Sequence, residues 1–88
     1  MNIKQLNYLI DVVTSESFLS VAQKYHVSES VIIQSIFKLE NEMGCKLIEC
    51  LSDSKVILTF EGSKIISFVK EVVLEYEELG EIIEEIKK

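Results

Sequence analysis

The last third of the chain carries an apolar residue at alternating intervals of four and three positions. The residues of this series are Ile65, Val69, Val72, Tyr76, Leu79, Ile83 and Ile86. Such spacing places apolar side chains at the a and d positions of a coiled coil over about three heptads. A helix of roughly 28 residues through this series would be about 40 Å long, because an α-helix rises about 1.5 Å per residue.

The part of the chain before this helix is too small to cover it. Only about 58 of the 88 residues precede it, and a chain of this length forms one small domain. We therefore predict that the series is the dimer interface between two copies of the chain, which makes the chain its own partner in a homodimer. The alternative is a helix that folds back onto its own domain.

The charge of the chain bears on its partners. Nine lysines, no arginines and fifteen carboxylates give a formal net charge of −6. A negative surface does not attract nucleic acid or an anionic membrane nonspecifically, since both are negatively charged and attract cationic side chains. No apolar run approaches the roughly 18 residues that a spanning helix requires. We expect no membrane partner and a cytoplasmic location.

Residues that carry catalysis or bind cofactors are nearly absent. His26 is the one histidine, and no glycine-rich phosphate loop or Cys/His cluster with metal-ligand spacing occurs. We therefore expect no enzyme, no metal, no cofactor and no small molecule bound within this chain. Cys45 and Cys50 are five residues apart, which in an extended segment sends them to opposite faces. They are predicted to be buried free thiols.

The first half of the chain predicts three helices from its apolar periodicity. The three apolar stripes are Leu6, Leu9, Ile10 and Val13, then Phe18, Val21, Ala22 and Tyr25, then Ile32, Ile36, Leu39 and Met43. Ser17 and Ser28 are suited to cap the second and third helices. Gly44 supplies the left-handed residue that ends the third helix.

The pattern changes after Gly44. Residues 46–50 and 55–58 are short β-prone runs separated by the turn cluster 52–54, and Thr59 is suited to cap the long last helix. The fold class predicted is mostly α, a winged helix-turn-helix of three helices and a two-stranded hairpin followed by a long dimerisation helix. The winged domain is expected at 1–58, with its helix-turn-helix at about 18–43, and the dimerisation helix at 59–88.

This order of signals is similar to that of a known family. The residues that carry the likeness are the opening Met1 to Leu6, Ser17-Phe18, Val21-Ala22, His26-Val27-Ser28, Ile36, Leu39-Glu40, Gly44, Leu47, Leu58-Thr59 and Gly62. The segment 1–62 resembles the N-terminal DNA-binding domain of LysR-type transcriptional regulators, and 59–88 resembles the linker helix that pairs in their dimers. The resemblance implies a sequence-specific DNA-binding regulator domain that binds as a homodimer, with the helix after Ser28 in the major groove.

The surface that would read DNA departs from the family pattern. The family's third helix typically begins S-Q-P-A-L-S-R-Q-I, and the matching run here is S-E-S-V-I-I-Q-S-I. Glu29 therefore replaces a glutamine, Ile33 a serine and Gln34 an arginine. Cys50 replaces the arginine of the family's wing. Two cations are lost and one carboxylate is gained, which weakens the attraction to phosphate.

Two functions remain open from the sequence. If the domain binds DNA, the residues predicted to contact it are Ser28, Glu29, Ser30, Ile33, Gln34, Lys38 and Lys55. Of these, Lys38 and Lys55 are expected at phosphates and the others at or near base edges. The alternative is a dimeric protein-interaction module on the same scaffold with impaired DNA binding. In that case Ile33 and Phe37, an exposed i, i+4 apolar pair, would face a protein partner.

Overall fold

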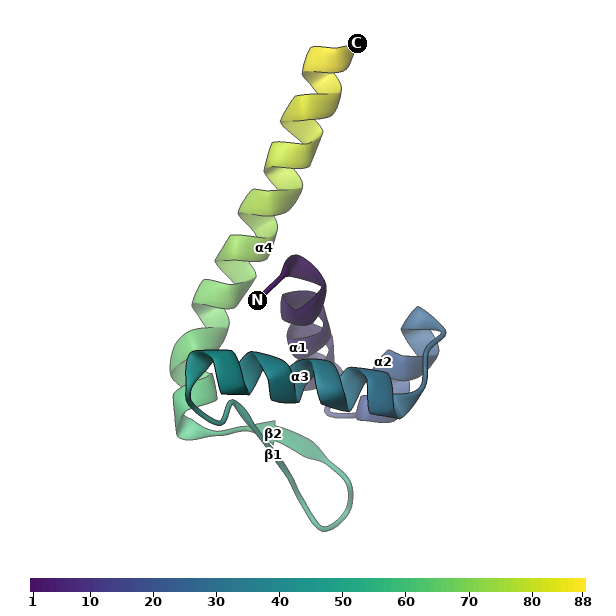
Figure 1. Ribbon diagram of the computed structural model, residues 1–88, viewed down its shortest axis with the longest axis vertical. Helices are drawn as coiled ribbons and strands as arrows, with labels where there is room; N and C mark the ends of the chain where they lie inside the picture. Colours follow the sequence, from purple (N-terminus) through teal and green to yellow (C-terminus); the bar gives the residue numbers. More distant parts are fainter.

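The computed structural model describes all residues from Met1 to Lys88 and contains four helices and one antiparallel hairpin (Figure 1). The elements are α1 (Ile3–Ser15), α2 (Phe18–Tyr25), α3 (Glu29–Met43), β1 (Ile48–Cys50), β2 (Val56–Leu58) and α4 (Phe60–Lys87). The hairpin register pairs Ile48 with Leu58 and Cys50 with Val56. This arrangement confirms the predicted winged helix-turn-helix followed by a long helix. None of the four helices is both long and apolar enough to cross a membrane.

The helix ends follow the capping signals of the sequence, with one exception. The Ser17 hydroxyl accepts a hydrogen bond from the Ser20 N–H, and the Thr59 hydroxyl accepts one from the Gly62 N–H. Gly44 ends α3 at a φ of 74°, a left-handed conformation that glycine adopts without steric cost. Ser28 occupies the N-cap position of α3, but its hydroxyl makes a hydrogen bond with the Ser30 hydroxyl instead of a backbone N–H.

One apolar core holds the domain together. Its fourteen buried residues come from all four helices and from the hairpin region: Leu6, Tyr8, Leu9, Val12, Val21, Ala22, Ile32, Ile36, Leu39, Leu47, Ile48, Val56, Val69 and Val73. The predicted stripes of α1, α2 and α3 supply much of this core. The first turns of α4 complete it by packing against α1 and β2.

This packing corrects the predicted dimer interface at its first positions. Val69 is only 4% exposed and lies in the core of its own domain, so it is not available to a second chain. Ile65 is partly buried against the same core. The prediction was wrong for Val69 because a 4-3 spacing identifies apolar positions on a helix without saying which of them its own domain covers.

Beyond Val73, α4 projects away from the rest of the molecule (Figure 1) and none of its residues is buried. A row of exposed apolar side chains follows one side of it, which we call the outer stripe: Phe68, Val72, Tyr76, Leu79, Ile83 and Ile86. Successive helical residues are turned by about 100°, so this stripe lies next to the side that carries Val69 and Val73. The first residues of the outer stripe, Phe68 and Val72, lie in the part of α4 that packs on its own domain through Val69 and Val73.

Two contacts with Leu47 fix the wing, the hairpin formed by β1 and β2, relative to the helices. The buried carboxylate of Glu40, on α3, accepts hydrogen bonds from the N–H groups of Leu47 (2.7 Å) and Ile48 (3.3 Å). Gly62, in the first turn of α4, lies against the Leu47 carbonyl, and a Cβ atom on Gly62 would be 2.0 Å from that oxygen. The start of the wing is thus held by both α3 and α4.

The two cysteines are free, but neither is fully buried. Cys45 is partly buried, whereas Cys50 is exposed. The prediction of buried thiols was wrong for Cys50 because this residue ends a three-residue strand and adjoins the exposed turn of the hairpin.

Candidate nucleic-acid interface

The outward face of α3 carries the residues that the sequence predicted at DNA. Helix α3 crosses the domain on its front surface in Figure 1, and the wing extends from below it. Ile32, Ile36 and Leu39 turn inward and are fully buried, which leaves the opposite face of the helix to solvent. Of the predicted residues on α3 and at its cap, five are exposed: Ser28, Glu29, Ser30, Gln34 and Lys38. Ile33 is half-buried, so it offers less apolar surface than expected.

This face can hydrogen-bond to base edges but carries little positive charge. Ser30 and Gln34 supply neutral donors and acceptors, and the Glu29 carboxylate can only accept when it is ionised. Lys38 is the one lysine of α3, and it takes part in none of the three ion pairs of the chain. Lys38 is therefore free to contact a phosphate.

An open hollow of about 620 Å³ adjoins the C-terminal half of α3. Its lining consists of Phe37, Glu40, Asn41, Gly44, Cys45 and Lys46. The Phe37 side chain is 49% exposed, and the ammonium of Lys46 lies 5.8 Å from the centre of its ring. Phe37 was predicted as an exposed apolar contact, but the hollow left no sequence signal because it depends on how the chain turns after Gly44.

On the wing, the second predicted phosphate ligand already has a partner. The Lys55 ammonium lies 3.2 Å from the Glu16 carboxylate, and both side chains are about half exposed. The backbone carbonyl of Glu16 also accepts a hydrogen bond from the Val56 N–H at 3.0 Å. Glu16 was not predicted at this site because it lies at the end of α1, far from the wing in the chain, and no short motif links the two.

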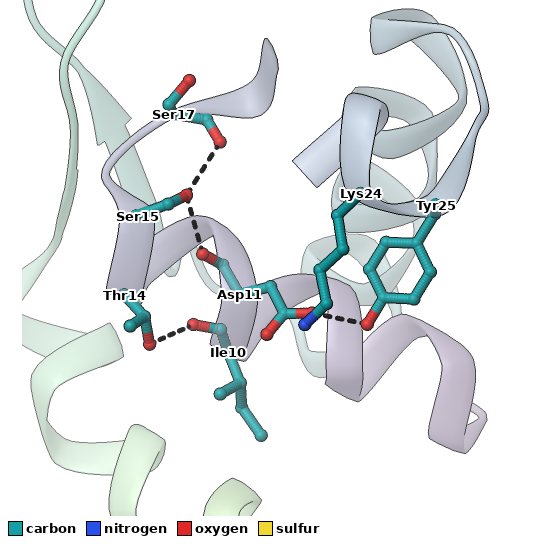
Figure 2. A network of polar contacts seen from close by, with 7 residues as sticks. All are labelled: Ile10, Asp11, Thr14, Ser15, Ser17, Lys24 and Tyr25. Atoms are coloured by element: carbon teal, nitrogen blue, oxygen red, sulfur yellow. Dashed lines mark hydrogen bonds and ion pairs between the residues drawn. The ribbon is translucent and has the colours of Figure 1, made fainter. Parts of the chain in front are cut away.

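A polar network centred on Asp11 joins α1 to the first helix of the helix-turn-helix (Figure 2). The Asp11 carboxylate accepts a hydrogen bond from the Tyr25 hydroxyl and forms an ion pair with Lys24 at 3.1 Å. Partial burial of Tyr25, together with this hydrogen bond and the negative charge of Asp11, raises the pKa of its hydroxyl to about 12. The Tyr25 ring also packs edge-on against Tyr8, with ring centres 4.9 Å apart. These contacts fix the position of α2, and through it the start of α3.

Side-chain hydrogen bonds to nearby backbone carbonyls follow at the end of α1. The Thr14 hydroxyl donates to the Ile10 carbonyl, and the Ser15 hydroxyl contacts the carbonyls of Asp11 and Ser17 (Figure 2). Ser15 therefore links the last turn of α1 to the N-cap of α2. No group of three or more side chains from His, Cys, Asp and Glu is placed to hold a metal ion.

Helices α2 and α3 form a helix-turn-helix in which the outward face of α3 is exposed, and the hairpin of β1 and β2 adjoins it. Together they define a winged helix-turn-helix domain. The profile described as "bacterial regulatory helix-turn-helix protein, lysR family" matches residues 3–63. The chain belongs to this LysR family, and the matched segment is a regulatory helix-turn-helix domain and not an enzyme.

Curated relatives of the chain are regulators of the same kind. It is 27% identical to the HTH-type transcriptional regulator BsdA of Bacillus subtilis over the whole of this chain and 30% of that protein. It is 34% identical to the dual regulator OxyR of Escherichia coli over 93% of this chain and 27% of OxyR. The chain thus spans less than a third of the length of these relatives.

Solved structures share the fold over the full chain. The DNA-binding domain of BenM in complex with benA site 1 DNA matches with a TM-score of 0.89 and 25% identity, covering all of this chain and 98% of that one. Full-length OxyR C199D from Pseudomonas aeruginosa matches with a TM-score of 0.91 and 26% identity, covering all of this chain and 30% of that one. The likeness extends to the projecting α4.

Proposed function

We propose that the chain is the sequence-specific DNA-binding domain of a LysR-type transcriptional regulator, which acts in the cytoplasm and binds duplex DNA as a homodimer. The observation that carries this proposal is the exposed outer face of α3, which presents Ser30, Gln34 and Lys38 beside the wing. An α-helix with such a face fits the major groove of B-DNA. The similar BenM domain, whose structure contains benA site 1 DNA, supports DNA binding by this fold.

Each residue of this face has a chemically defined role in the proposal. Gln34 can donate and accept at once, which suits the edge of an adenine, and Glu29 can accept from the amino group of a cytosine. Ser28 and Ser30 contact the DNA near the start of α3. Ile33 contributes a partial apolar contact to a thymine methyl. Lys38 neutralises a phosphate and so adds affinity without sequence preference.

The homodimer is proposed to form through the outer stripe of α4. Six apolar side chains along one side of an exposed helix make an apolar surface that a second copy can bury. The domain division proposed is 1–58 for the winged part and 59–88 for the dimerisation helix. The interface consists of Val72, Tyr76, Leu79, Ile83 and Ile86, with Phe68 added and Ile65 at its edge.

Selection from a random duplex library at low salt tests the proposal. A sequence-specific reader enriches one motif, and two copies of that motif if it binds as a dimer. Gln34→Ala should enrich a different motif because it removes a base-edge contact. Glu77→Ala, at an exposed position of the projecting part of α4, is the control and should leave the motif unchanged. Enrichment of no motif by the folded wild-type dimer would exclude the proposal.

Two observations favour a second candidate, a dimeric protein-interaction module. The chain carries a net charge of −6, and Phe37 is half exposed at the edge of the hollow beside α3. A protein partner would be favoured by an apolar side chain at this site, whereas duplex DNA gains little from it. Under this alternative, the folded dimer would enrich no motif in the duplex selection.

A further inference from the structure

Glu16 contacts the wing through both its backbone and its side chain. Its carbonyl receives the Val56 N–H at 3.0 Å, and its carboxylate lies 3.2 Å from the Lys55 ammonium. The residue ends α1 in a left-handed conformation, with a φ of 59°. The backbone hydrogen bond fixes the main chain of Glu16 beside the wing, within reach of Lys55 for its side chain.

We propose that the Glu16 carboxylate competes with the DNA phosphates for Lys55. Because it occupies the Lys55 ammonium, it lowers the affinity of the domain for DNA. This proposal rests on the proposed function, since it assumes that the wing approaches a duplex. A carboxylate and a phosphate oxygen both accept charge-assisted hydrogen bonds from an ammonium. Lys55 can therefore exchange one for the other, but not bind both at full strength.

Exchange of Glu16 for a phosphate at Lys55 affects folding stability little but weakens DNA binding. The pair is about half exposed, at 47% for Lys55 and 48% for Glu16, and ion pairs of this kind contribute little to stability. Lys55 can therefore leave Glu16 easily. The Glu16 carboxylate, however, stays tethered beside the wing after the exchange and repels the phosphate that has replaced it. The cost thus falls on DNA binding and not on folding.

Other carboxylates of the wing do not occupy the Lys55 ammonium in this way. Asp53 accepts a hydrogen bond from the backbone N–H of Lys55 at 3.1 Å, which shapes the turn. Glu49 lies on β1, is exposed, and takes part in no ion pair. Glu16 alone pairs with the one lysine that the wing offers to DNA.

The test measures the affinity of the full chain for a random-sequence duplex as a function of salt concentration. Glu16→Gln keeps a hydrogen-bond acceptor but removes the charge. It should raise affinity at low salt by about fivefold per subunit, or about 25-fold for a dimer. The slope of log K against log salt should become steeper by about 0.9 per subunit, because one more phosphate is neutralised. Glu16→Asn, which tolerates the left-handed conformation better, should behave in the same way.

Two further variants separate this effect from a general change of charge. In a Lys55→Gln background, Glu16→Gln should raise affinity clearly less than it does in the wild type, since the part of the gain that acts through Lys55 is then lost. Glu81→Gln removes one carboxylate from the exposed, projecting part of α4 and should change affinity by less than about twofold, because salt screens distant charges.

The outcomes distinguish this inference from the proposed function. If the wild-type chain binds duplex and neither Glu16 variant binds more tightly, the inference is wrong and the proposed function stands. The inference is also wrong if Glu16→Gln raises affinity in the Lys55→Gln background as much as it does in the wild type. If neither the wild-type chain nor any variant binds duplex at low salt, both the proposed function and the inference are overturned.

Discussion

The Glu40 carboxylate lies 2.7 Å from the backbone nitrogen of Leu47 and accepts its hydrogen bond inside the domain. The same oxygen accepts the N–H of Ile48, so one side chain of α3 satisfies two buried backbone donors at the start of the wing. An unpaired buried donor costs about 1–3 kcal/mol. Glu40 therefore connects the helix proposed to read DNA with the hairpin proposed to flank it.

Replacement of Glu40 tests this connection. Glu40→Ala leaves both N–H groups without a partner and should lower the free energy of unfolding by about 3 kcal/mol. Glu40→Gln keeps an acceptor oxygen and should lower the free energy of unfolding by less. Urea denaturation measures both, and Glu84→Ala, which removes an exposed and unpaired carboxylate of α4, is the control. An unchanged midpoint for Glu40→Ala would show that the contact does not stabilise the wing.

Gly62 and Gly80 offer a matched pair within α4. A Cβ atom on Gly62 would be 2.0 Å from the Leu47 carbonyl oxygen, whereas a Cβ on Gly80 would meet nothing within 4 Å. Gly62→Ala must push α4 away from the wing and should destabilise the domain by about 3 kcal/mol or more. Gly80→Ala should stabilise the helix by up to about 1 kcal/mol. Thermal unfolding at equal protein concentration measures the change in stability for each variant. If Gly62→Ala and Gly80→Ala changed the melting temperature equally, the packing described would be contradicted.

The outer stripe predicts how lysine substitutions in α4 differ. Val72→Lys and Leu79→Lys place a charge on the exposed apolar side and should convert the dimer to a folded monomer. Leu74→Lys, on the opposite side of the helix, is the control and should stay dimeric. Val69→Lys should instead unfold the domain, because Val69 lies in its core. Sedimentation velocity with circular dichroism separates these outcomes, and a dimer that persists in both Val72→Lys and Leu79→Lys would exclude this interface.

Much of this fold could be predicted from the sequence because local signals suffice for it. The apolar stripe of Ile32, Ile36 and Leu39 identified the buried side of α3, and Ser17 and Thr59 marked helix starts that the structure confirms. Val69 was misassigned because periodicity locates an apolar side but not what covers it. Pairings between distant segments, such as Glu16 with Lys55, depend on tertiary packing and left no sequence signal.

Partial burial of Tyr25 beside Asp11 leads us to expect a loss of stability at high pH. The pKa of Tyr25 is raised from 10.0 to about 12 in the folded chain, so the unfolded chain loses this proton at a lower pH than the folded one. The contribution of Tyr25 to stability is therefore complete below about pH 10 and disappears as the pH rises through about 12.

Melting temperatures of the wild type and Tyr25→Phe across this pH range test the prediction. The advantage of the wild type should shrink as the pH rises, since phenylalanine has no proton to lose. Gln23→Ala, at an exposed position of α2 that carries no ionisable group, is the control and should run parallel to the wild type. A constant difference between the wild type and Tyr25→Phe up to pH 12 would mean that Tyr25 does not titrate as described.

The proposal that α3 binds DNA is tested most directly by the salt dependence of duplex affinity in Lys38→Gln. Lys38 is the one cation of this helix and has no carboxylate partner. Its removal should weaken binding to every sequence alike and reduce the slope of log K against log salt by about 0.9 for each subunit. Lys70→Gln, on α4, should leave the slope unchanged. A slope that is the same in the wild type and in Lys38→Gln would contradict the placement of α3 on DNA.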